Sequence, residues 1–283
     1  MKDVIQTKLD QYQSSTTEDE ENALKEITQE VALYALAKSG FFSKACFQGG
    51  TCLRILYGLD RFSEDLDFCL KEPDLNFNLT DYLTKVTKIM ADYGYNIDVV
   101  GKDQEANNVK MRFLKDNSIK KILKFEHGLD QRRKIKIKVE IDINPPGDAH
   151  SQQVFIDFPL DFSIVAHDLP SLFAGKCHAL LSRDYTKGRD WYDFSWYVAR
   201  GTQLNYKFFA NALRQTGPWS SQDQLKVDEK WLKNTLTERV KQIDWPAAIV
   251  DVRRFLPANR QASLELWGVE FFLAKIAKMF RQS

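Results

Sequence analysis

The segment that most limits the fold of this chain is residues 134–144, which alternates strictly between apolar and polar side chains. Its odd-numbered positions hold Ile or Val, and its even-numbered positions hold Lys, Glu, Asp or Asn. Successive side chains of a β-strand point to opposite faces, so this alternation predicts a strand with one apolar and one charged face. Pro145, Pro146 and Gly147 follow directly and end it. The chain therefore needs a β-sheet.

Strand and helix patterns divide the rest of the chain. Before residue 134, alternation predicts strands over 45–47, 65–70, 95–100, 109–114 and 119–126, and apolar spacing predicts helices over 17–38, 51–57 and 79–93. After His167 the spacing is helical, over 168–182, 188–199, 204–215, 228–242, 245–255 and 260–280. We therefore expect an α+β fold with a helical segment over 1–40, a mixed-sheet core over 41–165 and a helical C-terminal domain over 166–283.

A glycine pair and a carboxylate pair lie near one another in the first part of the core. Gly49 and Gly50 follow a strand and open a helix, where backbone N–H groups and the helix dipole suit phosphate oxygens. Asp65 and Asp67 are two positions apart on the next strand, so both carboxylates leave one face. Carboxylates aimed at one point need a cation between them, and hard oxygen ligands suit Mg²⁺. This order of elements predicts a magnesium-dependent triphosphate site.

A third carboxylate completes many two-metal sites for in-line displacement at phosphorus. The strand at 134–144 offers Glu140 and Asp142 on its charged face. Either of them could turn toward the metal. The sequence thus predicts that Glu140 or Asp142 joins Asp65 and Asp67 as a further metal ligand or as a base.

Lys176 and two aspartates lie on consecutive predicted helices. A fixed ammonium near a triphosphate would offset the charge that develops on the pyrophosphate leaving group. Asp190 and Asp193 are three positions apart and share one helix face, and one of them could orient Lys176 or take the proton of an acceptor hydroxyl. The alternative is a surface helix on which Arg189 and Asp193 form an ion pair and Trp191 packs inward.

Two stretches resemble the AbiEii/AbiGii toxin family within the DNA polymerase β-like nucleotidyltransferase superfamily. The first is Gly49-Gly50-Thr51 followed by Arg61-Phe62-Ser63-Glu64-Asp65-Leu66-Asp67-Phe68. The second stretch has two parts. The family's lysine-bearing helix is resembled by Asp168-Leu169-Pro170-Ser171-Leu172-Phe173-Ala174-Gly175-Lys176, and its Arg-Asp-x-x-Asp helix by Arg189-Asp190-Trp191-Tyr192-Asp193. Gly50 stands where many members carry Ser, although Thr51 could supply a hydroxyl. The resemblance covers roughly residues 40–200.

The resemblance implies transfer of a nucleoside monophosphate from an NTP, in several members onto tRNA, by a toxin that has a cognate antitoxin protein. We expect the active site in the cleft between the two domains. The expected roles are Mg²⁺ binding by Asp65 and Asp67 with Glu140 or Asp142, triphosphate binding by Gly49, Gly50 and Thr51, charge neutralisation by Lys176, and catalytic support by Asp190 or Asp193.

Charge distribution bears on the acceptor. Residues 101–138 carry twelve Lys or Arg against five Asp or Glu, although the whole chain has a net charge of +1. A cationic segment with Phe113 and Phe125 interleaved favours an RNA acceptor, while the alternative is an ordinary solvated basic surface. Other acceptors would be a small molecule such as an antibiotic, or a protein hydroxyl. From another class, the chain could be a non-catalytic nucleotide-binding module, or a toxin-like protein that acts by sequestration.

The spacing of the cysteines and the length of the apolar runs indicate the cellular compartment of the protein. The cysteines Cys46, Cys52, Cys69 and Cys177 form no C-x-x-C pair, which predicts buried free thiols in a reducing compartment. No apolar run approaches the length of a membrane span, and residues 1–10 lack the apolar core of a signal peptide. We therefore expect a cytoplasmic protein that does not bind membranes.

Overall fold

A computed structural model describes residues 2–101, 108–128, 130, 134–222 and 225–281 of the chain. It divides into two compact units. The first, here called the α/β unit, consists of Met1–Gly58, Phe62–Pro145 and Gln152–Ala166, and the second, the helical unit, consists of Leu59–Arg61, Pro146–Ser151 and His167–Ser283. The strands and helices of the structure confirm the α+β class expected from the sequence.

The α/β unit is built on one seven-stranded sheet with the order β3-β4-β5-β2-β1-β7-β6. Strand β2 pairs with β5 in parallel and with β1 in antiparallel fashion, and β4 pairs with both β3 and β5 in antiparallel fashion. The strands are β1 (Ala45–Gln48), β2 (Asp65–Leu70), β3 (Ile97–Val100), β4 (Val109–Asp116), β5 (Ile135–Asp142), β6 (Ser151–Ile156) and β7 (Phe162–His167). The mixed pairing makes the two strands with candidate carboxylates direct neighbours.

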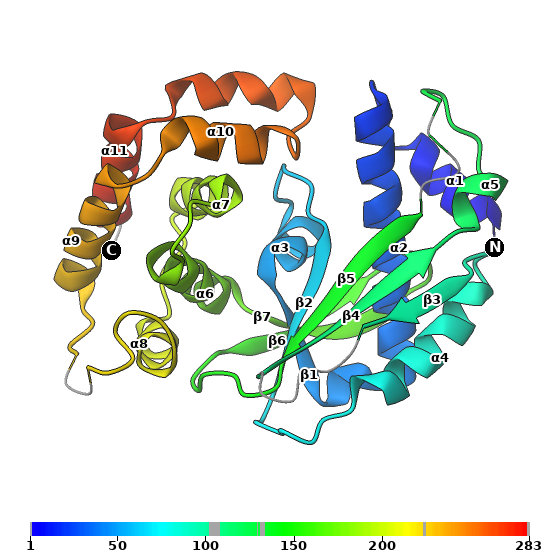
Figure 1. The fold of residues 1–283 in the computed structure, drawn as a ribbon, viewed down its shortest axis with the longest axis horizontal. Helices are drawn as coiled ribbons and strands as arrows, with labels where there is room; N and C mark the ends of the chain where they lie inside the picture. Colours follow the sequence, from blue (N-terminus) through cyan, green and yellow to red (C-terminus); the bar gives the residue numbers. More distant parts are fainter. Residues whose placement is uncertain (1, 102–107, 129, 131–133, 223–224, 282–283) are drawn as a thin grey trace. The chain divides into compact units, whose positions relative to one another are not determined.

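One face of the sheet is buried under helices, as Figure 1 shows. Helix α2 (Thr17–Ser39) contacts β5, and α4 (Leu79–Ala91) contacts α2 and β3. The apolar positions of β5, from Ile135 to Ile141, are at most 2% exposed. Its charged positions, Lys136, Lys138 and Glu140, are exposed or half-buried. The alternation at 134–144 therefore separates a core face from a polar face, as the sequence predicts.

Local capping explains the bounds of α2. The Thr16 side chain accepts a hydrogen bond from the Asp19 N–H at 3.1 Å, and acidic residues fill the first turn. Gly40, with φ +84°, ends the helix in the left-handed conformation that suits glycine. Most of α2 is buried, so this helix forms the centre of the core of the α/β unit.

The helical unit contains α6 (Leu169–Ser182), α7 (Gly188–Ala199), α8 (Tyr206–Gln215), α9 (Glu229–Lys241), α10 (Trp245–Arg253), the 3-10 helix η2 (Ala258–Leu266) and α11 (Val269–Met279). Aromatic side chains form its core. The rings of Trp245 and Phe272 stack with centroids 4.3 Å apart, and Trp191 packs edge-on against both. Burial of such large rings stabilises the unit by several kcal/mol, at about 1.5–3 kcal/mol for one large apolar side chain.

The structure corrects the sequence prediction in several places. The expected strand over 119–126 is instead the short helix α5 (Ile119–Ile122). The Asp116 carboxylate accepts hydrogen bonds from the N–H groups of Ser118 and Ile119 at 3.0 and 2.8 Å, which starts a helical turn despite the alternating pattern. The expected helix over 260–280 is two elements, η2 and α11, separated at Gly268. Helix α1 (Lys2–Asp10) and strands β6 and β7 are elements of the structure that the sequence patterns do not predict.

Two other expectations concern cysteines and membranes. All four cysteines are free and buried, as predicted. In the described parts of the chain, no helix combines the length and the apolar character needed to cross a membrane.

Candidate active site

Asp65 and Asp67 leave the same face of β2, with Leu66 and Phe68 buried on its other side. Leu66 is 0% and Phe68 1% exposed, whereas both aspartates are half-buried. The parallel pairing of β2 with β5 sets Asp67 opposite Glu140. Because paired residues of neighbouring strands share a face, Glu140 adds a third carboxylate beside the pair.

Asp142 shares this face but lies two pairs farther along β5, opposite Cys69. Its carboxylate accepts a hydrogen bond from the Asn144 N–H at 2.9 Å, and burial raises its pKa above the ordinary range. Asp142 thus belongs to the turn that ends β5. Of the two acids that the sequence left open, Glu140 is the one in register with Asp67.

An ammonium group already lies among these carboxylates. Lys138 is in register with Asp65, and its Nζ is 2.8 Å from Glu140 Oε2. Burial lowers the pKa of Lys138, but the charges of Glu140, Asp65 and Asp67 outweigh burial and raise it. This part of the sheet therefore favours a cation, and its oxygen donors fit the preference of Mg²⁺.

The same carboxylates are not yet arranged as a complete metal cage. Across the described residues, no group of three acidic, histidine or cysteine side chains is assembled closely enough to hold an ion. Glu140 is engaged with the Lys138 ammonium instead. Binding of a divalent ion would therefore require the carboxylates to rotate away from Lys138 and toward the ion.

The turn from β1 into α3 (Gly49–Tyr57) brings the glycine pair to the carboxylates. Gly49 has φ +80°, in the left-handed region that favours glycine. A Cβ at Gly49 would also lie 2.8 and 2.9 Å from the Cβ and Cγ of Asp67, which is too close for real atoms. The sequence predicted glycine here for the approach of a phosphate, and the structure adds that Asp67 itself occupies the space next to Gly49.

Gly50 and Thr51 form the first turn of α3, where helix N–H groups lack acceptors within the helix. Gly50 is half-buried, but Thr51 is 0% exposed and its hydroxyl donates a hydrogen bond to the Asp65 carbonyl oxygen. The hydroxyl of Thr51 thus fastens α3 to β2. The hydrogen of this hydroxyl is thus used within the protein, and triphosphate binding by Thr51 stays a prediction.

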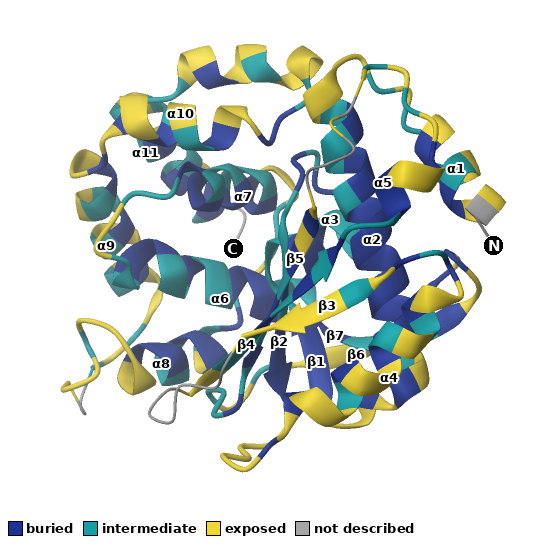
Figure 2. Ribbon diagram, turned by 45° about the vertical axis from the view of Figure 1, so that its right-hand side comes forward, coloured by how far each residue is buried: buried dark blue, intermediate teal, exposed yellow. Residues whose placement is uncertain are grey.

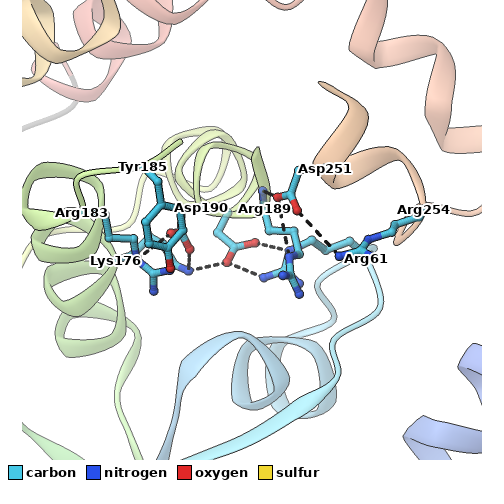
Figure 3. A network of polar contacts seen from close by, with 9 residues as sticks. Arg61, Lys176, Arg183, Tyr185, Arg189, Asp190, Asp251 and Arg254 are labelled. Atoms are coloured by element: carbon cyan, nitrogen blue, oxygen red, sulfur yellow. Dashed lines mark hydrogen bonds and ion pairs between the residues drawn. The ribbon is translucent and has the colours of Figure 1, made fainter. Parts of the chain in front are cut away.

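Lys176, Asp190 and Asp193 form a buried ion cluster within the helical unit (Figure 3). The Lys176 Nζ lies 2.6 Å from Asp190 Oδ1 and 2.8 Å from Asp193 Oδ2. Arg61 binds both oxygens of Asp193, at 2.6 Å through Nε and 2.7 Å through Nη2. The two aspartates do share one face of α7, as predicted. The role of Arg61 was missed, although it stands in the string that carries the family resemblance.

Opposite charges keep this cluster ionised. Burial would raise the pKa of Asp193, but Arg61 and Lys176 outweigh burial and lower it. Burial would likewise raise the pKa of Asp190, and Lys176 and Arg183 lower it. Carboxylates held ionised in this way are weak proton acceptors. The cluster therefore favours the orienting role of the aspartates over a role as general base.

The surface ion pair considered as an alternative for α7 is wrong. Asp193 is 0% exposed and binds Arg61 and Lys176. Arg189 instead lies beside Asp251, with Nε 3.8 Å from Oδ2. Trp191 packs into the core, in agreement with that part of the alternative.

The described cations of the basic segment 101–138 lie on different elements and differ in exposure. Lys102, Arg132 and Arg133 lie outside the described residues. Lys120 is only 3% exposed, so it is unavailable to a phosphate, whereas Lys121 and Lys124 are exposed near α5. The cations on the described strands are Lys110, Arg112 and Lys115 on β4 and Lys136 and Lys138 on β5, and Arg112 is only 7% exposed.

Comparison with known proteins identifies relatives of this chain. The family model described as nucleotidyl transferase AbiEii toxin, type IV toxin–antitoxin system, matches residues 31–275. MenT4, a nucleotidyltransferase toxin from Mycobacterium tuberculosis H37Rv, has a similar fold at 17% identity, with a TM-score of 0.54 over 99% of both chains. JHP933 from Helicobacter pylori is 18% identical, with a TM-score of 0.52 over 90% of both chains. No curated protein matches.

Proposed function

This chain belongs to the nucleotidyl transferase AbiEii toxin family of type IV toxin–antitoxin systems, and we propose that it transfers a nucleoside monophosphate from an NTP to the 3′ end of a tRNA. Membership in the family makes it a nucleotidyltransferase and implies an antitoxin partner. The metal, the site residues and the tRNA acceptor are our proposal. Its main support is the register that sets Glu140 opposite Asp67 beside the Gly49 turn.

Asp65, Asp67 and Glu140 are the proposed ligands of Mg²⁺. The bound ion would neutralise the phosphates and the charge that develops on them during transfer. The first turn of α3 would hold the triphosphate, because its N–H groups and the helix dipole favour anions there. Gly50, half-buried in that turn, leaves room for a phosphate to approach the backbone.

The transfer is a displacement at the α-phosphorus. The oxygen of the acceptor hydroxyl forms a bond to the α-phosphorus, the bond to the bridging oxygen breaks, and pyrophosphate leaves with that electron pair. The hydroxyl proton goes to Glu140. This assignment suits Glu140 because it lies on β5, on the side of β2 away from β1 and the Gly49 turn that follows β1.

Lys176 would add positive charge at the triphosphate. Its ammonium is fixed by Asp190 and Asp193, which suits a group that must not reorganise during the reaction. Both aspartates would thus act by positioning Lys176, since opposite charges lower the pKa of each carboxyl.

Sequencing of tRNA 3′ ends from cells that express the protein tests this function. Wild-type protein should slow growth and leave extra nucleotides on tRNA ends. Glu140→Gln should abolish both effects, whereas Asp142→Asn, a matched change on the same strand face, should retain them. Unmodified tRNA ends in slowed cells, together with a modified protein or small molecule, would move the acceptor to one of the other classes.

A further inference from the structure

The polar face of the sheet continues past the carboxylates onto β4 and β3. Residues that share this face, by their pairing, are Val100, Met111, Phe113, Lys115 and Lys136, here called the β4 platform. Met111 lies opposite Glu140, and Phe113 lies opposite Lys138. The β4 platform is therefore continuous with the face that carries Asp65 and Asp67.

The β4 platform presents apolar side chains to solvent, and along β4 it is more open than the opposite face. Val100 is 42% exposed, Met111 and Phe113 are half-buried, and Leu114 on the other face is 1% exposed. Figure 2 shows β3 as an exposed strand at the edge of the sheet. An aromatic ring and its apolar neighbours beside a catalytic face suit a ligand with flat surfaces.

Cations lie directly beside this ring. The Lys136 Nζ is 3.8 Å from the centroid of the Phe113 ring, and Lys136 itself is exposed. Lys115 is paired with Lys136 across the strands, and an exposed acid on the same face, Asp98, is paired with Lys115. The face still carries a surplus of positive charge near Phe113. Stacking rings next to cations are the features by which proteins bind single-stranded nucleic acid.

The order of strands decides which reactant this surface faces. The Gly49 turn lies on the β1 side of β2, and Glu140 lies on the β5 side. The phosphates of the NTP would therefore lie toward β1, and the attacking hydroxyl toward β5. Neighbouring strands are about 4.8 Å apart, so β4 is about 10 Å from β2, within reach of the last nucleotides of an acceptor strand.

We propose that the β4 platform binds the unpaired 3′-terminal bases of the acceptor RNA, with Phe113 stacking on a base and Lys136 contacting the adjacent phosphate. A base on the Phe113 ring would displace the Lys136 ammonium toward the backbone of the strand. This inference rests on the proposed function, because the RNA bound by the β4 platform is the proposed acceptor, whose hydroxyl proton goes to Glu140. It assigns a recognition role to residues that neither bind the metal nor hold the triphosphate.

Fluorescence anisotropy with a labelled single-stranded RNA that has a free 3′-hydroxyl tests the β4 platform in the full-length protein. Phe113→Leu keeps an apolar side chain but removes the ring, so RNA affinity should fall about tenfold. Phe113→Tyr should restore it. Phe155→Leu is the control, because Phe155 is an exposed phenylalanine on β6, at the opposite edge of the sheet. Lys136→Gln should reduce the salt dependence of binding by about 0.7 log units per log unit of salt.

Steady-state kinetics give the second measurement. Phe113→Leu should raise the KM for RNA and leave the KM for NTP unchanged. RNA affinity equal to that of the wild type in Phe113→Leu would overturn the platform while leaving the transferase function intact. Absence of RNA binding by the wild type would overturn both. Loss of antitoxin binding in Phe113→Leu, with RNA binding unchanged, would contradict the proposal and identify the face as a protein interface.

Discussion

Asp67 lies against the α-carbon of Gly49, so that a Cβ on Gly49 would come within 2.9 Å of both the Cβ and the Cγ of Asp67. The glycine turn that starts α3 is thus packed directly against Asp67, the candidate metal ligand on β2. Glycine is needed for the backbone angle of the turn and for the space that Asp67 occupies. A change at Gly49 should therefore disturb the metal site as well as the turn.

Replacement of Gly49 by Ala should abolish magnesium-dependent NTP binding, because the added methyl group displaces Asp67. Gly58→Ala is the matched control: Gly58 ends the same helix with φ +72° and has open space around its α-carbon. It should cost only the strain of a left-handed residue, roughly 1–2 kcal/mol, and should retain NTP binding. Calorimetry on both variants checks this, and wild-type affinity in Gly49→Ala would refute the fit between the two residues.

Removal of the Lys138 ammonium should make stability depend on the metal. In chelator, Lys138→Met leaves Asp65, Asp67 and Glu140 to repel one another, and we expect a loss of up to about 1 kcal/mol for this partly exposed group. Saturating Mg²⁺ should remove most of that loss, because the ion takes the place of the ammonium. Thermal unfolding of Lys138→Met and of the control Lys136→Met, with and without Mg²⁺, measures the effect. An equal loss in both conditions would speak against metal binding here.

Lys176 should matter for both stability and activity. Lys176→Met leaves Asp190 and Asp193 buried with less positive charge, which should destabilise the protein by roughly 3–5 kcal/mol. Below the unfolding transition its transfer rate should still fall ~10²–10³-fold, while Lys176→Arg should keep the fold because it keeps the charge. Unfolding curves and single-turnover rates separate the two effects. Activity of folded Lys176→Met within about twofold of wild type would leave Lys176 a purely structural role.

His167 should make the protein less stable in acid. Its ring is 4% exposed, and burial lowers its pKa to about 4 despite the attraction of Asp168. Between the ordinary value of 6.5 and about 4 the unfolded chain binds more protons than the folded protein, so the free energy of unfolding falls as pH falls through this window. From pH 7 to pH 5 the loss should be about 2 kcal/mol.

The variant His167→Gln isolates this effect. Burial also raises the pKa of Glu30, to about 7, and that group shifts stability in the opposite direction. Subtraction of the variant from the wild type at each pH removes the contribution of Glu30 and leaves that of His167. Urea unfolding at pH 7 and pH 5 gives the four free energies. A constant difference between the two proteins would contradict the assignment to His167.

Local signals predicted most of the elements correctly. Gly40 and Gly58 end α2 and α3 close to the ends of the helices predicted over 17–38 and 51–57, because a left-handed terminal glycine needs no information from distant residues. The shared face of Asp65 and Asp67 follows from strand geometry alone. The strand at 119–126 was wrong for an equally local reason, since the Asp116 side chain caps a helical turn there.

Distant pairings could not be predicted from the sequence. The register of β2 with β5 selects Glu140 over Asp142, yet it depends on how strands far apart in the chain align. The ion pair of Arg61 with Asp193 likewise joins residues 132 positions apart. Charge and apolar patterns identify which residues need partners, but the choice of partner is made by the packing of the whole unit.

The most direct test of the central claim, nucleotidyl transfer at Asp65, Asp67 and Glu140, is transfer of label from an α-phosphate-labelled NTP to total RNA in vitro. Each of the four NTPs is incubated with RNA, Mg²⁺ and wild-type protein, Asp67→Asn or Asp142→Asn. Label should appear on RNA of tRNA size with the wild type and with Asp142→Asn. It should be absent with Asp67→Asn and in chelator. Undiminished labelling of RNA by Asp67→Asn would contradict the account.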